Sequence, residues 1–301
     1  MDKSTAAGHG AALATIIVWG TTFISTKVLL RALSPVEILF LRFSLGALAL
    51  CLACPRRLRI AERRRELYFA GAGLCGVTLY FLMENIALTY TMASNVGVLV
   101  SVSPLFTAIL AHFFLEGERL RPQFFAGLAA ALAGVVIITY NGSAVLRLNP
   151  IGDVLALLAA LVWSCYSVLT RKIGAFGYNT IQSTRRIFLY GLVFMLPALP
   201  LLGFHPAAAA LSRPVNLLNL LYLGLGASAA CFVTWNFALR RLGAVKTSVY
   251  IYLVPVVTIF TSALVLHERI TPLAALGTAL TMLGLFLSEF QFKRKAVAGQ
   301  G

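Results

Sequence analysis

Long apolar stretches alternate with short polar breaks along the whole chain. Each stretch approaches the ~20 residues that a helix needs to cross a bilayer, so the pattern predicts about ten transmembrane helices. The predicted spans of the first half are Ala11–Leu30, Val36–Ala53, Leu67–Tyr90, Asn95–Leu115 and Gln123–Tyr140. Those of the second half are Ile151–Thr170, Tyr178–Leu202, Val215–Leu239, Val245–Leu266 and Pro272–Phe292.

The separators between these stretches are short and carry helix breakers or charges. They include Ser34-Pro35, Pro55–Glu66, Glu116–Pro122, Asn141–Pro150 and His267–Pro272, and none is long enough for a soluble domain. With 59% hydrophobic and 12% charged residues, the chain has too little polar surface to cover a soluble globule. Unbroken apolar runs favour helices over the alternating strands of a membrane barrel, so the predicted fold class is an all-α membrane protein.

The distribution of the basic residues predicts the orientation. The formal net charge is +15, which by itself would also fit a nucleic-acid-binding protein. If the N-terminus is cytoplasmic, however, most Lys and Arg residues fall in cytoplasmic segments, among them the run Arg56–Arg65, and the outer loops hold only Arg31, Arg147, Arg213 and Arg269. This bias is the positive-inside pattern of a multi-pass protein with both termini in the cytoplasm, and it argues against a nucleic-acid partner.

The residues that usually carry catalytic or metal chemistry are scattered. The five cysteines lie within or at the edge of apolar segments, and Cys51-x-x-Cys54 lacks the second ligand pair of a metal site. The histidines show no ligand spacing, and no nucleotide-binding loop is present. We therefore expect no metal, no cofactor and no enzymatic activity, with a membrane-embedded enzyme as the alternative class.

The two halves of the chain repeat each other. One constant shift in numbering aligns Trp19 with Trp163, Thr26 with Thr170 and Arg42 with Arg186. A slightly larger shift aligns Asn85 with Asn236 and Pro104 with Pro255, and the pairs Glu118-Arg119 and Glu268-Arg269, Gly127 and Gly277, and Gly134 and Gly284 follow. The predicted repeats are residues 1–145 and 146–301.

An odd number of spans in each repeat makes the two copies enter the membrane with opposite orientations. This inverted five-plus-five arrangement is typical of secondary transporters, whose substrate sites lie between the halves near the middle of the bilayer. Duplication for packing alone is the alternative. We expect a small-molecule substrate and a lipid bilayer as partners, and the sequence leaves open whether the chain acts as a monomer or a dimer.

Several of these motifs resemble a known family. A Trp-Gly pair in a Thr-rich first span, Leu41-Arg42-Phe43, and the segments Gly117–Leu120 and His267–Ile270, each followed by a proline and a glycine-containing helix, are similar to the EamA family of the drug/metabolite transporter superfamily. The resemblance covers nearly the whole chain. It implies an inverted five-plus-five fold in a bacterial inner membrane and export of amino acids or other small metabolites, and it does not identify the substrate.

Polar and aromatic residues within the spans are the candidates for a central cavity. Trp19 and Thr22 share a face of the first span with Thr15 and Thr26, and Trp163 and Tyr166 do the same in the sixth. The full set of substrate-binding candidates is Trp19, Thr22, Arg42, Tyr80, Glu84, Trp163, Tyr166, Arg186, Trp235 and Tyr252. Hydrogen bonding between helices is the alternative explanation for the hydroxyl and indole groups.

Arg42 and Glu84 are the most informative of these candidates. An ionised group inside the hydrocarbon costs at least about 2.5 kcal/mol, so both side chains are expected to face the interior at a similar depth. Either they form a structural ion pair, or Arg42 binds a substrate carboxylate while Glu84 accepts an ammonium group or a proton. In the second repeat Trp235 replaces Glu84, so the symmetry is broken there.

The sequence also predicts two hinges and a mode of transport. Pro104 and Pro255 are predicted to kink equivalent helices and to act as hinges. We expect a transporter that works by alternating access. The alternatives are efflux of drugs or organic cations by proton exchange, and a scaffold without transport activity.

Overall fold

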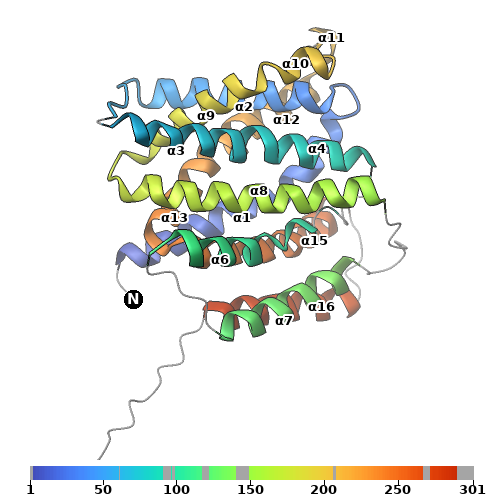
Figure 1. The fold of residues 1–301 in the computed structure, drawn as a ribbon. Coiled ribbons are helices and arrows are strands. Elements are labelled where there is room, and N and C mark those ends of the chain that lie inside the picture. The colour runs from blue at the N-terminus through green and yellow to red at the C-terminus, as the bar shows by residue number, and fades with distance from the viewer. Residues whose placement is uncertain are drawn as a thin grey trace, which may run out of the picture.

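The structure is a computed structural model, and it describes residues 3–60, 62–90, 96, 99–116, 122–139, 149–205, 208–266 and 272–289. All regular secondary structure in these ranges is helical. The predicted motifs Gly117–Leu120 and His267–Ile270 lie outside the described residues. Figure 1 shows the long helices side by side with nearly parallel axes, as expected of a helical bundle in a bilayer.

The helices of the first half follow the predicted apolar stretches closely. They are α1 (Lys3–Leu29), α2 (Pro35–Ala53), α3 (Arg63–Gly73), η1 (Leu74–Leu79), α4 (Tyr80–Tyr90), α6 (Ser103–Phe114) and α7 (Pro122–Thr139). The predicted third span is thus one continuous rod made of α3, η1 and α4.

The second half repeats this order with more interruptions. Its elements are α8 (Pro150–Ala175), α9 (Thr180–Met195), α10 (Ala198–Leu201), α11 (Ala208–Leu211), α12 (Pro214–Leu221), η2 (Tyr222–Ala230), α13 (Cys231–Leu242), α14 (Ala244–Ser248), η3 (Val249–Tyr252), α15 (Leu253–Leu266) and α16 (Pro272–Glu289). The predicted seventh span ends earlier than expected, since α9 stops at Met195 and the short α10 follows. The predicted ninth span is divided into α14, the 3-10 turn η3 and α15.

Several helices begin at the polar residues of the predicted separators. Ser34 caps α2 in a capping box with Glu37, whose carboxylate accepts the Ser34 backbone N–H at 2.7 Å, and Pro35 occupies the first turn. The side chain of Asn149 caps α8 by accepting a hydrogen bond from the backbone N–H of Gly152 at 3.3 Å. These caps satisfy backbone donors that would otherwise be unpaired at the helix ends.

Five of the described helices are long and apolar enough to cross a membrane. They cover Ser4–Thr26, Pro35–Ala53, Arg63–Tyr90, Pro150–Ala175 and Pro214–Leu242. Shorter apolar helices lie at Ser103–Phe114, Gln123–Ile137, Ala244–Val257 and Ala275–Leu285. Their bulky apolar residues remain exposed on the outer faces, for example Leu52, Phe113 and Leu218, as expected of surfaces that contact lipid.

The third helix of each half contains a π-helical segment at the same place. When the residue numbers of η1 are increased by the offset that aligns Asn85 with Asn236, they fall within η2. Glycines in both segments allow close packing: a Cβ atom on Gly76 would overlap the ring of Tyr166, and one on Gly224 would lie 2.8 Å from the Cβ of Leu45. π-Helical turns are often found at functional sites.

The helices α7 and α16 pack against each other at one edge of the bundle (Figure 1). A Cβ atom on Gly134 would overlap the backbone of α16 at Gly277 and Thr281, and a Cβ atom on Gly284 would overlap the backbone of α7 at Gly127 and Ala131. The end of each helix therefore faces the earlier part of the other, so the two helices are antiparallel. The glycines that recur in the two halves, Gly127 with Gly277 and Gly134 with Gly284, thus lie in a contact within this chain.

Candidate functional site

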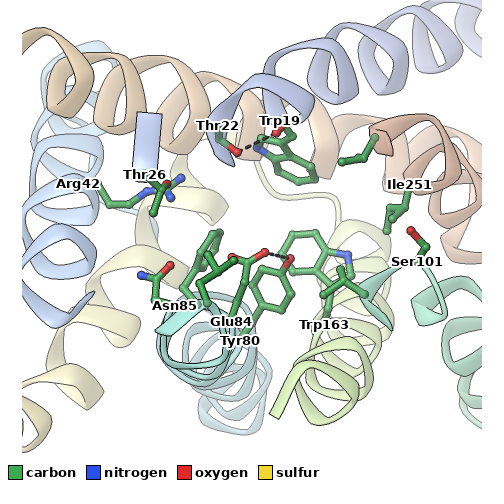
Figure 2. Close-up of a pocket in the computed structure, with 14 residues that line it drawn as sticks. Trp19, Thr22, Thr26, Arg42, Tyr80, Glu84, Asn85, Ser101, Trp163 and Ile251 are labelled. Carbon is green, nitrogen blue, oxygen red and sulfur yellow. Dashed lines mark hydrogen bonds between the residues drawn. The ribbon is translucent and has the colours of Figure 1, made fainter. Parts of the chain in front are cut away.

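A cavity lies between helices of both halves. Six of the predicted candidates line it, namely Trp19, Thr22, Arg42, Tyr80, Glu84 and Trp163. The other lining residues are Thr26, Phe81, Asn85, Leu88, Val100, Ser101, Ile251 and Val254. Figure 2 shows Arg42 and Thr26 on one side of this space, Trp163 and Ser101 on the other, and Glu84 and Tyr80 between them.

Arg42 extends into the cavity from α2 and is 3% exposed. Its Nε donates a 2.9 Å hydrogen bond to the hydroxyl of Ser228 in η2. Its guanidinium carbon lies 4.7 Å from the ring centroid of Phe81 and 5.3 Å from that of Phe43, within the range of cation–π attraction. Within the described part of the chain, its two terminal nitrogens have no hydrogen-bond partner, so they are available to an anion in the cavity.

Glu84 lies on α4, one turn after Tyr80, and is 8% exposed. The Tyr80 hydroxyl donates a 3.0 Å hydrogen bond to Oε1 of Glu84, marked in Figure 2. Among the described residues, Oε2 accepts no hydrogen bond. The carboxylate is thus oriented by Tyr80 and retains acceptor capacity toward the cavity.

Arg42 and Glu84 share the cavity without forming a direct ion pair. Both residues are described, and the ion pairs within 4.0 Å among the described residues join other partners, namely Arg65 with Glu62 and Arg186 with Glu66. Two buried charges of opposite sign that remain unpaired are costly in a low-dielectric interior. A solute that carries both an anionic and a cationic group would compensate both of them.

Aromatic rings form the wall between the two halves. The Trp19 ring meets that of Trp163 edge-on at 5.3 Å, and Tyr80 lies 4.7 Å from Trp163. The indole N–H of Trp19 donates to the carbonyl of Ala227 at 3.0 Å, a carbonyl within the π-helical segment η2. The indole nitrogen of Trp163 is buried and has no acceptor in the described part of the protein. An unpaired buried donor beside a cavity is a candidate contact for a solute.

Two predicted candidates lie behind this wall. Tyr166 is fully buried and donates a 2.6 Å hydrogen bond to Oδ1 of Asn236, whose Nδ2 donates at 3.0 Å to Thr184. Trp235 is also fully buried, with its ring 5.1 Å from that of Trp19. Tyr166 aligns with the cavity residue Thr22, so in the second half a larger side chain fills the equivalent position.

The remaining two candidates lie farther away. Arg186, the counterpart of Arg42, forms an ion pair with Glu66, which also accepts a 2.8 Å hydrogen bond from Tyr190. Tyr252 is fully buried and packs with Phe124 and Leu128 of α7. Neither residue lines the cavity that contains Arg42 and Glu84.

The two predicted hinge prolines lie in the first turn of a helix rather than in its middle. Pro104 is at the start of α6, after a turn at Ser101 and Val102, and Pro255 is the third residue of α15, directly after η3. Proline is well tolerated in the first turn, since its missing N–H would be unpaired there in any case. The irregular segments before the prolines, rather than bends at them, interrupt these spans.

Some cavity residues were not among the candidates, although the repeat pattern contains a signal for two of them. Thr26 and Asn85 both recur in the second half as Thr170 and Asn236, and both line the cavity. Val100, which is helical, and Ser101, which lies in the turn before α6, also line the cavity, and hydropathy does not single them out. Among the described residues, no group of three or more His, Cys, Asp or Glu side chains is arranged to hold a metal ion.

Comparisons with known proteins agree with this architecture. The model of the EamA-like transporter family matches the chain twice, over residues 6–140 and 150–290. A probable amino-acid metabolite efflux pump of Escherichia coli is 30% identical over 95% of this chain and 96% of its own length. A probable terminal-alkyne amino-acid exporter of Streptantibioticus cattleyicolor is 30% identical over 92% of this chain and 91% of its own. An uncharacterized transporter of Archaeoglobus fulgidus is 30% identical over 91% and 94%.

A protein of known crystal structure shares the fold. It superposes with a TM-score of 0.78 at 23% sequence identity, over 96% of this chain and 97% of the other. At this identity the likeness concerns the arrangement of the helices only.

Proposed function

Because the chain belongs to the EamA-like transporter family, and is thus a multi-pass membrane transporter, we propose that it exports amino acids or similar small zwitterionic metabolites across a bacterial inner membrane. The observation that carries this proposal is the cavity itself. It presents one guanidinium and one carboxylate that do not pair with each other, next to a wall of aromatic rings. The names of two relatives, which describe amino-acid export, support the same substrate class.

The proposed binding mode follows from the hydrogen-bond donors and acceptors that these groups do not use within the described part of the protein. The terminal nitrogens of Arg42 match a carboxylate, for which the planar guanidinium offers two parallel donors. Glu84, oriented by Tyr80 at 3.0 Å, accepts the ammonium group. The solute side chain would then lie against Trp19 and Trp163, whose rings offer apolar contact area.

The proposed topology has about ten spans in two inverted repeats, residues 1–145 and 146–301, with both termini in the cytoplasm. Three features support it. The family model matches once in each half, the π-helical segments η1 and η2 occur at equivalent places, and the last helices of the two halves are antiparallel and make reciprocal glycine contacts. The positive-inside bias supports the orientation.

The two halves of the protein differ in a way that fits alternating access. In the proposed topology the cavity lies in the outer half, between residues such as Thr26 and Asn85. On the cytoplasmic side the counterpart residues Thr170 and Asn236 border a smaller space, and the hydrogen bond from Tyr166 to Asn236 joins α8 to α13 there. We therefore propose that this structure represents an outward-facing state. Inward access would require this contact to break.

Transport by purified protein in liposomes tests the proposal. Labelled amino acids, with and without a pH gradient, are expected to cross the membrane only where the protein is present, and Arg42→Gln is expected to abolish the flux. A screen in which no amino acid or related zwitterion is transported would contradict the proposal and favour a scaffold role. Transport that is insensitive to the gradient would exclude obligatory proton coupling.

Efflux of organic cations in exchange for protons is a second candidate. One observation favours it: Glu84 lines the cavity together with the aromatic rings of Trp19, Tyr80, Phe81 and Trp163, and aromatic faces attract cations. The two candidates differ in their dependence on Arg42. Transport of a cation without a carboxylate should survive Arg42→Gln and fail in Glu84→Gln, whereas transport of a zwitterion should fail in both.

A further inference from the structure

A second cavity lies between the end of α2, the loop that follows it, and α9. Its polar lining comes from Arg57, Arg185, Arg186 and Gln182, and its apolar lining includes Cys51 and Leu189. It is remote from the Arg42 and Glu84 cavity and shares no residue with it. We call it the α2/α9 crevice.

The α2/α9 crevice carries positive charge that the protein does not neutralise. Arg186 is paired with Glu66. Arg185, in contrast, donates its terminal nitrogens to neutral acceptors, the backbone carbonyls of Cys54 and, at 2.7 Å, Arg56. Arg57 is exposed, and among the described residues neither it nor Arg185 has a carboxylate within 4.0 Å. The crevice therefore offers two uncompensated guanidinium groups to an anion.

The loop that forms one wall of the crevice is held firmly in place. Besides the two bonds from Arg185, the side-chain amide of Gln182 donates to the carbonyl of Arg56 at 3.3 Å and contacts the sulfur of Cys54 at 3.6 Å. Arg185 itself is 8% exposed. The basic wall is thus a preorganised part of the fold.

An apolar surface continues from the crevice along the same two helices. Leu48 and Leu52 of α2 are exposed one helical turn apart, and Leu189 and Val193 of α9 are exposed with the same spacing. The two helices pack against each other, as Figure 1 shows. A ligand with an anionic head and long apolar chains matches a basic crevice that opens onto such a surface.

We propose that the α2/α9 crevice binds the headgroup of an anionic phospholipid of the cytoplasmic leaflet, with its acyl chains along α2 and α9. In the proposed topology this end of α2 faces the cytoplasm, where basic pockets between helices attract anionic headgroups. Arg57 and Arg185 supply the charge, and Leu189 begins the path of the acyl chains.

Binding of defined lipids to the full-length protein in detergent tests this proposal. Native mass spectrometry would compare phosphatidylglycerol, phosphatidylcholine and inorganic phosphate. We expect preferential retention of phosphatidylglycerol and a loss of about fivefold in its apparent affinity for Arg57→Gln, the effect typical of one basic residue near an anionic membrane surface. Arg59→Gln is the matched control, since Arg59 is an exposed arginine of the same loop that does not line the crevice.

Three results would overturn the proposal. Equal retention of phosphatidylglycerol and phosphatidylcholine would remove the role of charge. Equal weakening by Arg57→Gln and Arg59→Gln would show a diffuse attraction without a defined crevice. Displacement of the lipid by millimolar inorganic phosphate would identify a site for soluble anions. Because the readout is lipid binding, each result is independent of whether amino acids are the transported solutes.

Discussion

Trp19 of α1 and Trp163 of α8 occupy equivalent positions in the two halves of the chain, and their rings meet edge-on with centroids 5.3 Å apart. Their indole N–H groups nevertheless have different surroundings. That of Trp19 donates to the Ala227 carbonyl at 3.0 Å, whereas that of Trp163 is buried without an acceptor in the described residues. The contact thus joins a tryptophan whose N–H is paired within the protein to one whose N–H has no acceptor among the described residues, and we propose that the second one contacts the solute.

Substitution of the two tryptophans by phenylalanine should separate these roles. Trp19→Phe removes the hydrogen bond to the Ala227 carbonyl and part of a packed indole ring, and should lower the free energy of unfolding by about 1–3 kcal/mol. Trp163→Phe keeps an aromatic ring and loses no hydrogen bond to a described residue, so its stability should change less while the KM for transport rises. Thermal unfolding in detergent and liposome transport measure the two effects. Equal loss of stability in both variants would contradict the distinction.

Glu84→Gln should impair transport without unfolding the protein. In the native protein the Tyr80 hydroxyl donates a 3.0 Å hydrogen bond to Glu84. The amide oxygen of glutamine can still accept this bond, but the negative charge is lost. We expect transport of a zwitterionic substrate to fall at least about tenfold, because a charge-assisted hydrogen bond is replaced by a neutral one. Initial transport rates in liposomes check this. Tyr80→Phe is the comparison, because it keeps the charge of Glu84 and removes only the hydrogen bond that orients the carboxylate. Unchanged rates in Glu84→Gln would assign the carboxylate a structural role.

Tyr166→Phe should loosen the closed cytoplasmic side. It removes the 2.6 Å hydrogen bond to Asn236 and leaves that amide partly unsatisfied. In a background without native cysteines, a cysteine at Thr170 should then react faster with a membrane-impermeant maleimide added from the cytoplasmic side. A cysteine at Thr26 should react more slowly from the outside, since the outward-facing population decreases. Unchanged labelling at both positions would show that this bond does not control access.

Gly134→Ala should destabilise the contact between α7 and α16. A Cβ atom there would overlap backbone atoms of Gly277 and Thr281, which cannot move aside as a side chain can. We expect a loss of about 1–3 kcal/mol, as for other overpacked sites. Gly10→Ala is the control, because nothing lies within 4 Å of a Cβ atom at Gly10, and alanine in place of an exposed helical glycine should stabilise α1 by about 0.5–1 kcal/mol. Thermal unfolding of both variants gives the comparison.

Much of the helical architecture can be predicted from the sequence, because long apolar runs and their caps are local signals. The predicted span from Val36 to Ala53 matches α2 within one residue at its start, and the predicted break at Ser34-Pro35 is the observed capping box. The division of Val245–Leu266 into α14, η3 and α15 was not predicted. This stretch is apolar throughout, and hydropathy does not register a change in helical pitch.

The candidate site was less predictable than the fold. The repeat pattern treats the two halves alike, so it proposed Arg186 and Tyr166 together with their counterparts Arg42 and Thr22. Which counterpart lines the cavity depends on tertiary packing. Arg186 has Glu66 as a partner, whereas the residue equivalent to Glu66 in the second half is Leu217, so Arg42 has no corresponding carboxylate. Aligned positions whose neighbouring residues differ in this way indicate which of two equivalent side chains is left for the cavity.

The contact between α7 and α16 brings equivalent residues of the two halves together. Gly134 fits against Gly277 and Thr281, while Gly284 fits against Gly127 and Ala131, so each side presents the same small-residue pattern to the other. A surface of this kind is self-complementary, as in an isologous dimer. A chain of half this length, ending after the equivalent of α7, would meet the same geometry in an antiparallel copy of itself. The two halves of the chain thus meet here as two copies of one subunit would, with equivalent residues contributed from each side.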